Sequence, residues 1–429
     1  MHISRLPLPL FLLPLLVIVA FTTSGRSGDV NVTLDAGSGF VVQDREATFE
    51  RFRVDEATGN FSRNGALFVH TTGANNTFVG EGAGNLLTTG DFNSGFGKDA
   101  LRSNTTGGSN SAFGVTALSS NTTGGSNSAF GGWALHSNTT SDYNSAFGDL
   151  ALFSNTTGGS NSAFGSWALR SNSRGTYNSA FGDLALFSNI TGDSNSGFGD
   201  RALFSNTTGT YNSAFGGGAL SVNDTGSFNS SFGDSALLNN TTGTNNVAVG
   251  HFAGFNQTTG NYNIYLANNG VAGESGQIKI GNDTDHTQAM IAGIHGNPVS
   301  SGINVLVNAS GFLGTTVSSA RFKQQVRDMG SASEVVMALR PVTFHYRKEV
   351  AEGDAAPQYG LIAEEVAEVA PELVVLDAEG KPYSVRYHVL PSLLLNEVQN
   401  QHRELQKQKQ VIAALETRLA QLEQVSSAE

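Results

Sequence analysis

Hydrophobic and polar positions in the middle of the chain repeat with a period of 17 residues. In each copy an apolar residue is followed by glycine, preceded three positions earlier by asparagine and followed four positions later by alanine. Eleven copies run without an insertion or deletion, so each repeat is expected to be one structural unit stacked on the next. The apolar residues are Val79, Phe96, Phe113, Phe130, Phe147, Phe164, Phe181, Phe198, Phe215, Phe232 and Val249.

Each repeat is expected to contain two short strands and two tight turns, because it is too short for a pair of helices and shows no 3.6-residue periodicity. Ser-Ala-Phe-Gly is the first predicted strand, Ala-Leu-x-Ser is the second, and Asn-Thr-Thr-Gly provides turn residues. The phenylalanines are predicted to form an internal stack and the asparagines an amide ladder. No proline lies between Pro14 and Pro298, as uninterrupted coil-to-coil hydrogen bonding requires. Residues 76–270 therefore predict a β-solenoid, or β-roll.

The N-terminal residues have the pattern of an export signal. Residues 6–21 are almost wholly apolar, follow a single cation at Arg5 and contain three prolines. This run is shorter than the roughly 20 apolar residues that a spanning helix needs. Residues 1–25 are therefore predicted to be a signal peptide, with an uncleaved anchor as the alternative. The mature protein is then secreted or at the cell surface, with no stable membrane insertion after signal removal, and residues 26–75 are predicted to form a β-rich N-terminal segment.

The C-terminal third has a different composition from the repeats. Residues 76–250 contain 15 charged residues in 175, whereas residues 318–429 contain 28 in 112. Residues 271–317 are predicted to form a β-rich neck, with short strands expected at 277–281, 289–294 and 303–313. Within 318–390, a strand at 342–346 and a helix at 361–369 indicate a small α+β domain.

A heptad pattern covers residues 391–425 and predicts a coiled coil. One seam consists of apolar residues spaced by seven, and a second seam, also spaced by seven, begins with two glutamines. Polar residues in such a seam can set the register and the number of helices of the coiled coil. Three strands would match a trimeric roll, and the alternative is a single amphipathic helix packed on its own domain. The first seam is Val398, Leu405, Ile412 and Leu419, and the second is Gln401, Gln408, Leu415 and Leu422.

Composition and charge exclude several classes of site. The 24 basic and 36 acidic residues give a net charge of −12, and no basic cluster is present, which argues against nucleic-acid binding. The chain has no cysteine, so disulfides, zinc knuckles and thiol nucleophiles are excluded. Aspartates in the repeats are too irregular for a calcium roll. The Asn-Thr-Thr triplets match glycosylation acceptors, but turn chemistry explains them. No cofactor or metal is predicted.

The repeat also resembles a known type of surface protein. The pattern Asn-Ser-Ala-Phe-Gly-x-x-Ala-Leu over residues 76–270 resembles the left-handed parallel β-roll heads of trimeric autotransporter adhesins. This resemblance implies a left-handed roll and a homotrimer in which each chain contributes one roll. The expected fold is therefore mainly β: a left-handed parallel β-roll of 17-residue repeats, a small α+β domain and a C-terminal trimeric coiled coil.

A second resemblance covers nearly all of residues 318–429. Four motifs there resemble the endosialidase-type intramolecular chaperone domain that ends phage tailspikes and fibres. Members of that family trimerise the chain, guide folding of the preceding β-structure and then cut themselves off. The motifs are Ser-Ser-Ala-Arg-Phe-Lys at 318–323, Leu-Arg-Pro-Val-Thr-Phe at 339–344, Tyr-Gly-Leu-Ile-Ala-Glu-Glu-Val at 359–366 and Val-Arg-Tyr at 385–387.

This family resemblance assigns a catalytic pair. It places the nucleophile at Ser318 and the base at Lys323, with the cut between Val317 and Ser318. A lysine serves as a base where burial depresses its pKa. Many members have aspartate after the nucleophile, whereas this chain has Ser319, which leaves the choice between the two serines open. His345, His388, Glu364 and Glu365 are expected to have structural or solvated roles rather than catalytic ones.

The resulting functional prediction is an exported homotrimeric fibre or adhesin-like surface protein that cleaves itself once as a serine/lysine autoprotease. A cell-surface or glycan target is the expected partner. One alternative is a non-cleaving trimeric binding module in which the C-terminal domain remains as a stalk. A carbohydrate-active tailspike is the other alternative, although carboxylates are sparse in the repeats.

Overall fold

A computed structural model describes residues 40–43, 50–55, 57–64, 66–282, 284–292, 294, 302–308, 310–347, 356–377 and 379–426. The predicted signal peptide lies outside these residues. The chain divides between residues 290 and 291 into two compact units, each described by itself below. In the part of the chain that the structure describes, no helix combines the length and the apolar character needed to cross a bilayer.

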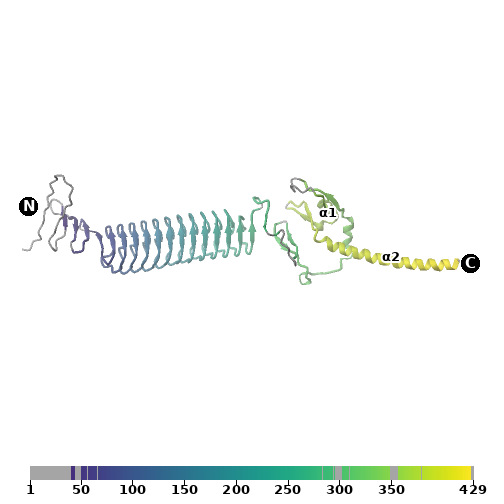
Figure 1. Ribbon diagram of the computed structural model, residues 1–429, viewed down its shortest axis with the longest axis horizontal. Coiled ribbons are helices and arrows are strands. Elements are labelled where there is room, and N and C mark those ends of the chain that lie inside the picture. Colours follow the sequence, from purple (N-terminus) through teal and green to yellow (C-terminus); the bar gives the residue numbers. More distant parts are fainter. Residues whose placement is uncertain are drawn as a thin grey trace, which may run out of the picture. The chain divides into compact units, whose positions relative to one another are not determined.

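The first unit is a β-solenoid of about 12 turns, built on stacked parallel strands (Figure 1). The strands from β5 (Thr77–Val79) to β16 (Ile264–Leu266) pair in register at the same repeat position, and β17 (Ile278–Ile280) ends the stack after a shorter coil. The structure therefore confirms the mainly β fold and the solenoid. The strands between are β6 (Ser94–Phe96), β7 (Ser111–Phe113), β8 (Ser128–Phe130), β9 (Ser145–Phe147), β10 (Ser162–Phe164), β11 (Ser179–Phe181), β12 (Ser196–Phe198), β13 (Ser213–Phe215), β14 (Ser230–Phe232) and β15 (Val247–Val249).

Each regular coil contains one strand, so the prediction of a second strand at Ala-Leu-x-Ser is wrong. That segment forms turns because its leucine and the residue directly before the segment both have a positive φ, as at Thr116 (56°) and Leu118 (51°). A residue in the left-handed region cannot continue a strand. The two left-handed residues turn the chain sharply enough to close a coil of 17 residues.

Alanine and leucine fill the interior of the coils, and the predicted internal phenylalanine stack is wrong in its location. Side chains alternate along a strand, so only the central residue of Ser-Ala-Phe points inward. Ala112, Ala117 and Leu118 are fully buried, as are their equivalents in other coils. The phenylalanines do stack, with ring centroids 4.6–5.1 Å apart from Phe96 to Phe232. They lie on the outer face of the sheet, where they remain partly exposed.

Two buried asparagine ladders run through the coils. The predicted ladder, from Asn76 to Asn263, is confirmed: each side-chain oxygen accepts the backbone N–H of the asparagine one coil further on, at 2.7–3.1 Å. A second ladder joins the asparagines of the Asn-Thr-Thr turns, from Asn104 to Asn240, at 2.8–3.0 Å. These turn asparagines are fully buried. The Asn-Thr-Thr triplets are therefore not accessible glycan acceptors in the folded solenoid.

Replacing Asn161 by alanine is expected to lower the free energy of unfolding by about 2–4 kcal/mol, because each buried polar group left unpaired costs about 1–3 kcal/mol. Asn161 accepts the backbone N–H of Asn178 at 3.0 Å and donates to the carbonyl of Gly175 at 2.8 Å. Urea denaturation measures the change. Thr157→Ala, at an exposed position of the neighbouring turn, is the control. Equal stabilities for the two variants would contradict the proposed role of the ladder.

Four antiparallel strands cover the N-terminal end of the solenoid. They are β1 (Phe40–Gln43), β2 (Glu50–Val54), β3 (Phe61–Arg63) and β4 (Ala66–His70). Strand β4 pairs antiparallel with β5, so the first coil does not present an open edge. His70 ends β4 almost fully buried, and its ring lies 4.8 Å from that of Phe78, centroid to centroid.

The surroundings of His70 select its neutral form. Its Nε2 lies 2.6 Å from the carbonyl oxygen of Ala83, which can only accept, so Nε2 carries the proton. Its Nδ1 lies 3.0 Å from the Thr72 hydroxyl and 3.5 Å from the Thr72 backbone N–H, which makes Nδ1 an acceptor. Burial lowers the pKa of His70 below its usual 6.5, against a smaller opposing effect of the Ala83 carbonyl.

Acidification is therefore expected to loosen this N-terminal cap. Since the folded pKa is the lower one, the unfolded state binds the proton more readily. The contribution of a neutral His70 is complete above about pH 6.5 and is lost as the pH falls below it toward the folded pKa. Exchange of backbone amides is base-catalysed in this range, so the quantity to compare is the protection factor, which is corrected for the intrinsic rate. The protection factors of the Thr77 and Gly80 amides should fall between pH 7.5 and pH 5. His70→Gln, which can still donate to Ala83, should remove that loss of protection, and an unchanged pH dependence in this variant would exclude His70 as the cause.

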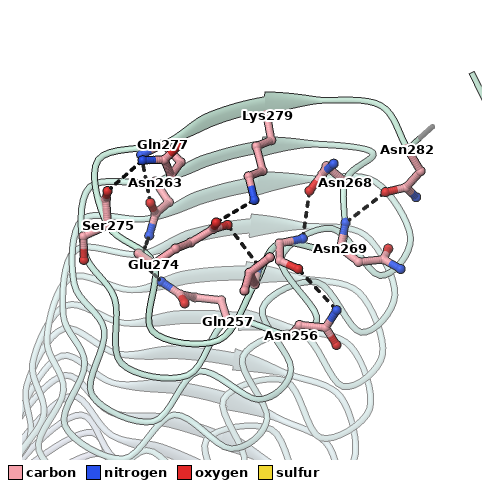
Figure 2. Close-up of polar contacts among 12 residues, drawn as sticks. Asn256, Gln257, Asn263, Asn268, Asn269, Glu274, Ser275, Gln277, Lys279 and Asn282 are labelled. Atoms are coloured by element: carbon pink, nitrogen blue, oxygen red, sulfur yellow. Dashed lines mark hydrogen bonds and ion pairs between the residues drawn. The ribbon is translucent and has the colours of Figure 1, made fainter. Parts of the chain in front are cut away.

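A buried tyrosine closes the C-terminal end of the solenoid, together with a network of polar side chains that Figure 2 shows. Tyr265 takes the inward position of β16 and is fully buried, in space left by Gly254 and Gly270, where a Cβ would lie 2.8 Å from its ring. Burial raises the pKa of Tyr265, and so does Glu274. Glu274 pairs with Lys279 of β17 at 2.5 Å, and its carbonyl oxygen accepts the side-chain amide of Asn263 at 2.8 Å.

The second unit contains small sheets and two helices. Its strands are β18 (Val305–Val307) with β19 (Leu313–Thr315), β20 (Val342–Phe344) with β21 (Gln358–Gly360), and β22 (Val374–Leu376) with β23 (Pro382–Val385). The α-helices are α1 (Ala363–Val369) and α2 (Leu390–Ser426), and the short 3-10 helices are η1 (Ala320–Phe322), η2 (Gly330–Ala338) and η3 (Pro371–Leu373). Two expected neck strands differ: the one at 277–281 is β17 of the solenoid sheet, and the described residues of 289–294 form no strand.

The hydrophobic core of the second unit is small. Among its described residues, the buried apolar cluster consists of Val366, Ala370, Leu373 and Val385, contributed by α1, the residue that follows it, η3 and β23. Leu390 and Leu393, at the start of α2, pack against this cluster. Beyond its contacts with η2, the rest of α2 extends away from this cluster (Figure 1).

Candidate functional site

The structure brings the predicted catalytic pair together. The 3-10 turn η1 folds the chain back after Ser318, since the backbone N–H of Phe322 donates to Ser319 O and that of Lys323 to Ala320 O, both at 3.0 Å. This turn places Lys323 Nζ 3.3 Å from Ser318 Oγ, within hydrogen-bond reach. A separation of five residues is therefore spanned by one tight turn.

In the single chain this pair is open to solvent. Val317, Ser318 and Lys323 are all exposed, with 61% of Val317 accessible. In a contact of this kind an ammonium group can only donate to the serine oxygen. A general base must instead accept the hydroxyl proton. The geometry of the pair is present in one chain, whereas the burial that would keep a lysine neutral, and so able to accept a proton, is not.

An ion pair joins two of the C-terminal sequence motifs. Arg340 of the Leu-Arg-Pro motif donates from Nε and Nη2 to the two carboxylate oxygens of Glu365, with 3.0 Å between Nε and Oε2. The hydrogen bond from Arg340 lowers the pKa of Glu365, and Glu365 raises that of Arg340. The sequence suggested that Glu365 lies on a solvated face of the helix. In the structure it instead connects α1 to the segment before β20.

A tyrosine hydroxyl joins a third motif to these two. The backbone N–H of Leu361 donates to the Tyr387 hydroxyl at 2.9 Å, which links Tyr-Gly-Leu to Val-Arg-Tyr. Glycine is needed at residue 360, because a Cβ there would lie 2.7 Å from the same hydroxyl. Arg386 donates from Nη1 to Glu372 O at 3.2 Å. These motif residues hold the unit together.

A buried serine anchors η2 to α2. The Asn396 side-chain amide donates to Gly330 O at 2.8 Å and to Ser333 Oγ at 2.7 Å, and Ser333 Oγ donates to Glu397 at 3.3 Å. Ser333 is fully buried. Sequence reasoning missed this contact, because its partners lie more than 60 residues apart and no spacing connects them.

Helix α2 presents an unpaired apolar seam. All six apolar residues of the two heptad seams are more than half exposed in the single chain: Val398, Leu405, Ile412, Leu415, Leu419 and Leu422. At the start of the helix, Leu390 and Leu394 line an open apolar groove of about 580 Å³, together with residues of β20, β21 and η2. Leu394 lies one heptad step before Gln401, so the groove adjoins the face of α2 that carries the second seam.

The remaining candidates do not form a site. His345 and His388 are both exposed. In the described part of the chain, no three or more histidine, aspartate or glutamate side chains gather where they could hold a metal ion.

Comparison with known proteins identifies the C-terminal segment. Residues 318–375 match the family described as the chaperone of endosialidase, which confirms the resemblance seen in the motifs. The match begins at Ser318 and ends before the Val-Arg-Tyr motif and α2. No curated protein and no solved structure gives a significant match to the chain.

Proposed function

We propose that this chain is an exported homotrimeric fibre- or adhesin-like surface protein. Its C-terminal unit brings three copies together, guides folding of the solenoid, and then cuts the chain once between Val317 and Ser318. The observation that carries this proposal is the match of residues 318–375 to the chaperone of endosialidase family. Export rests on the predicted signal peptide at residues 1–25.

The exposed seam of α2 supports trimerisation. A helix of 37 residues with apolar side chains every three or four positions is stabilised mainly by burying that stripe. The small core of the second unit leaves this stripe uncovered, and a second copy of the same stripe fits it through knobs-into-holes packing. Three copies would bury the seam and the adjoining apolar groove together.

The outer phenylalanine ladder offers a second contact between copies. From Phe96 to Phe232 it forms an uninterrupted apolar stripe along one face of the solenoid. Parallel copies related by a threefold axis along the solenoid place equal residues at equal heights, so their ladders meet in register. If one chain slipped by 17 residues along its neighbours, it would make almost the same contacts. A C-terminal trimerisation domain would therefore be needed to set the register first.

The proposed cleavage uses Ser318 and Lys323. In the neutral form, the Lys323 amine accepts the proton of Ser318 Oγ, and Oγ attacks the carbonyl carbon of Val317. The bond from this carbon to the Ser318 nitrogen breaks, and the proton passes to that nitrogen, which leaves an ester on Oγ. Water then hydrolyses the ester, releasing Val317 as a carboxylate and restoring the hydroxyl. Burial between copies would supply the neutral lysine, so cleavage would follow assembly.

Intact and native mass spectrometry of the protein from the culture medium tests this proposal. We expect a chain that ends at Val317, a fragment that begins at Ser318, and a trimeric parent assembly. A trimer of whole chains would favour the non-cleaving module with a permanent stalk. A monomer of whole chains would contradict both versions.

A further inference from the structure

One column of the solenoid carries exposed aromatic rings that the fold does not need. The residue directly before each ladder asparagine is aromatic in six coils, and every one of these rings is more than half exposed. The backbone N–H groups of this column bond to the preceding coil, for example Tyr143 to Gly125 O and Tyr177 to Gly159 O, both at 3.2 Å. The aromatic members are Phe92, Tyr143, Tyr177, Tyr211, Phe228 and Tyr262.

Backbone preference would select other residues at this position. Every member of the column has a φ of 57–61°, in the left-handed region. Asparagine adopts that conformation most readily among residues with a side chain, and Asn75 and Asn245 occupy it in two coils. A tyrosine at the same place bears the backbone strain without burying its ring. Its benefit must therefore come from something other than solenoid stability.

Tyrosine and serine alternate along part of the column, which leaves two positions where a small side chain lies between two exposed rings; these two positions are called slots below. Ser160 lies between Tyr143 and Tyr177, and Ser194 lies between Tyr177 and Tyr211. Both serines are half-buried at the base of the exposed rings. The two rings of this column that lie in neighbouring coils, Tyr211 and Phe228, are parallel, with centroids 5.1 Å apart and planes 8° from parallel. Rings two coils apart are then separated by about 9.4–9.8 Å, twice the strand spacing.

This spacing matches an extended proline-rich peptide. A polyproline II helix rises about 3.1 Å per residue and has three residues per turn, so equivalent side chains recur about every 9.3 Å. The two slots are centred two coils apart, within about 0.5 Å of that repeat. Contact distances of about 3.5–4.0 Å to each ring leave about 2 Å for the thickness of the occupant, which suits a puckered pyrrolidine ring.

The negative charge of the solenoid around this column indicates which residues would flank the prolines of a ligand. Asp142 and Asp193 lie directly beside the column, and residues 76–250 carry ten acidic against five basic side chains. Single-stranded nucleic acid also stacks on aromatic rings, but it requires a positively charged groove.

We propose that the two slots bind a proline-rich peptide with basic flanks in the polyproline II conformation, one proline in each slot. This proposal does not depend on the autoprotease. In a threefold assembly equivalent rings share one height, so the rings of neighbouring copies do not enter the slots.

Binding of a designed peptide to the secreted protein, whether or not it is cut at Val317, tests this proposal. The probe is a fluorescein-labelled peptide with arginine at both ends and proline at every third position in an alanine background. Fluorescence anisotropy should show binding at least tenfold tighter than that of a peptide of the same composition with its prolines contiguous. The Tyr143→Ser, Tyr177→Ser and Tyr211→Ser triple variant should lose this binding more than tenfold. Serine already occupies this position in other coils, so we expect its thermal unfolding to be unchanged.

A second variant distinguishes binding in the slots from nonspecific binding to exposed aromatic rings. Ser160→Tyr with Ser194→Tyr fills both slots while adding aromatic surface, and it should also weaken binding more than tenfold. Ser126→Tyr makes the same change outside the slots and should leave binding unchanged. Binding that is retained or strengthened when the slots are filled would overturn the proposal. So would the absence of peptide binding, or binding of chitotetraose in place of the peptide.

Discussion

Replacing Ser318 by alanine is expected to leave the secreted chain whole. The variant lacks the hydroxyl oxygen that attacks the Val317 carbonyl, and removal of a nucleophile slows such reactions by at least about 10³-fold. The wild-type chain should be recovered as two fragments under the same conditions. Intact mass spectrometry distinguishes the two results directly, since the fragments meet at a single bond.

Two matched variants sharpen this test. Ser319→Ala should be cut as the wild type is, because the Lys323 nitrogen is hydrogen-bonded to Ser318 Oγ. Lys323→Arg should stay whole, since a guanidinium keeps its charge and cannot act as the base. Cleavage of Ser318→Ala together with an intact Ser319→Ala would move the nucleophile to Ser319. Cleavage of both serine variants would exclude a nucleophile in this turn.

Replacing Ile412 by aspartate is expected to convert the proposed trimer into monomers. Ile412 lies in the apolar seam of α2, where it is 53% exposed in the single chain. Truncating a buried isoleucine costs about 2–5 kcal/mol, and a trimer loses that amount in each of its three chains. Three carboxylates brought close together add repulsion. Sedimentation velocity at micromolar concentration should show a shift from three chains to one.

Gln410→Asp is the control for this variant. It introduces the same charge two residues away, at an exposed position outside both seams of the helix. Its oligomeric state should remain that of the wild type. Ile412→Asp should also slow the cut before Ser318, because separated chains leave the pair exposed as in the single chain. A monomeric variant that still cleaves at the wild-type rate would contradict burial between copies as the source of the lysine base.

Local sequence patterns were sufficient to predict the solenoid and its first asparagine ladder. A fixed 17-residue period allows one arrangement in which every coil meets an identical neighbour, so stacking follows from spacing alone. The long C-terminal helix α2 is likewise predicted by its heptads, and the proximity of Ser318 to Lys323 needs only one tight turn. These features depend on residues close together in sequence or on exact repetition.

Tertiary structure decided which side chains face the interior. The repeat places phenylalanine and leucine at equally regular positions, so periodicity could not distinguish them. Strand alternation turns Phe113 outward, and the left-handed turn at Leu118 directs that leucine inward. The second predicted strand failed for the same reason, because backbone dihedrals in a turn depend on how the coil closes.

Contacts between distant segments also lay beyond the sequence. The burial of His70 and Tyr265 at the two ends of the solenoid follows from where the stack stops, and the link from Tyr387 to Leu361 follows from how the second unit folds. The sequence by itself determined the repeating unit, the long helix and the catalytic candidates. Only the tertiary structure decided which residues are buried and which rings remain exposed, because burial depends on neighbours that spacing along the chain does not identify.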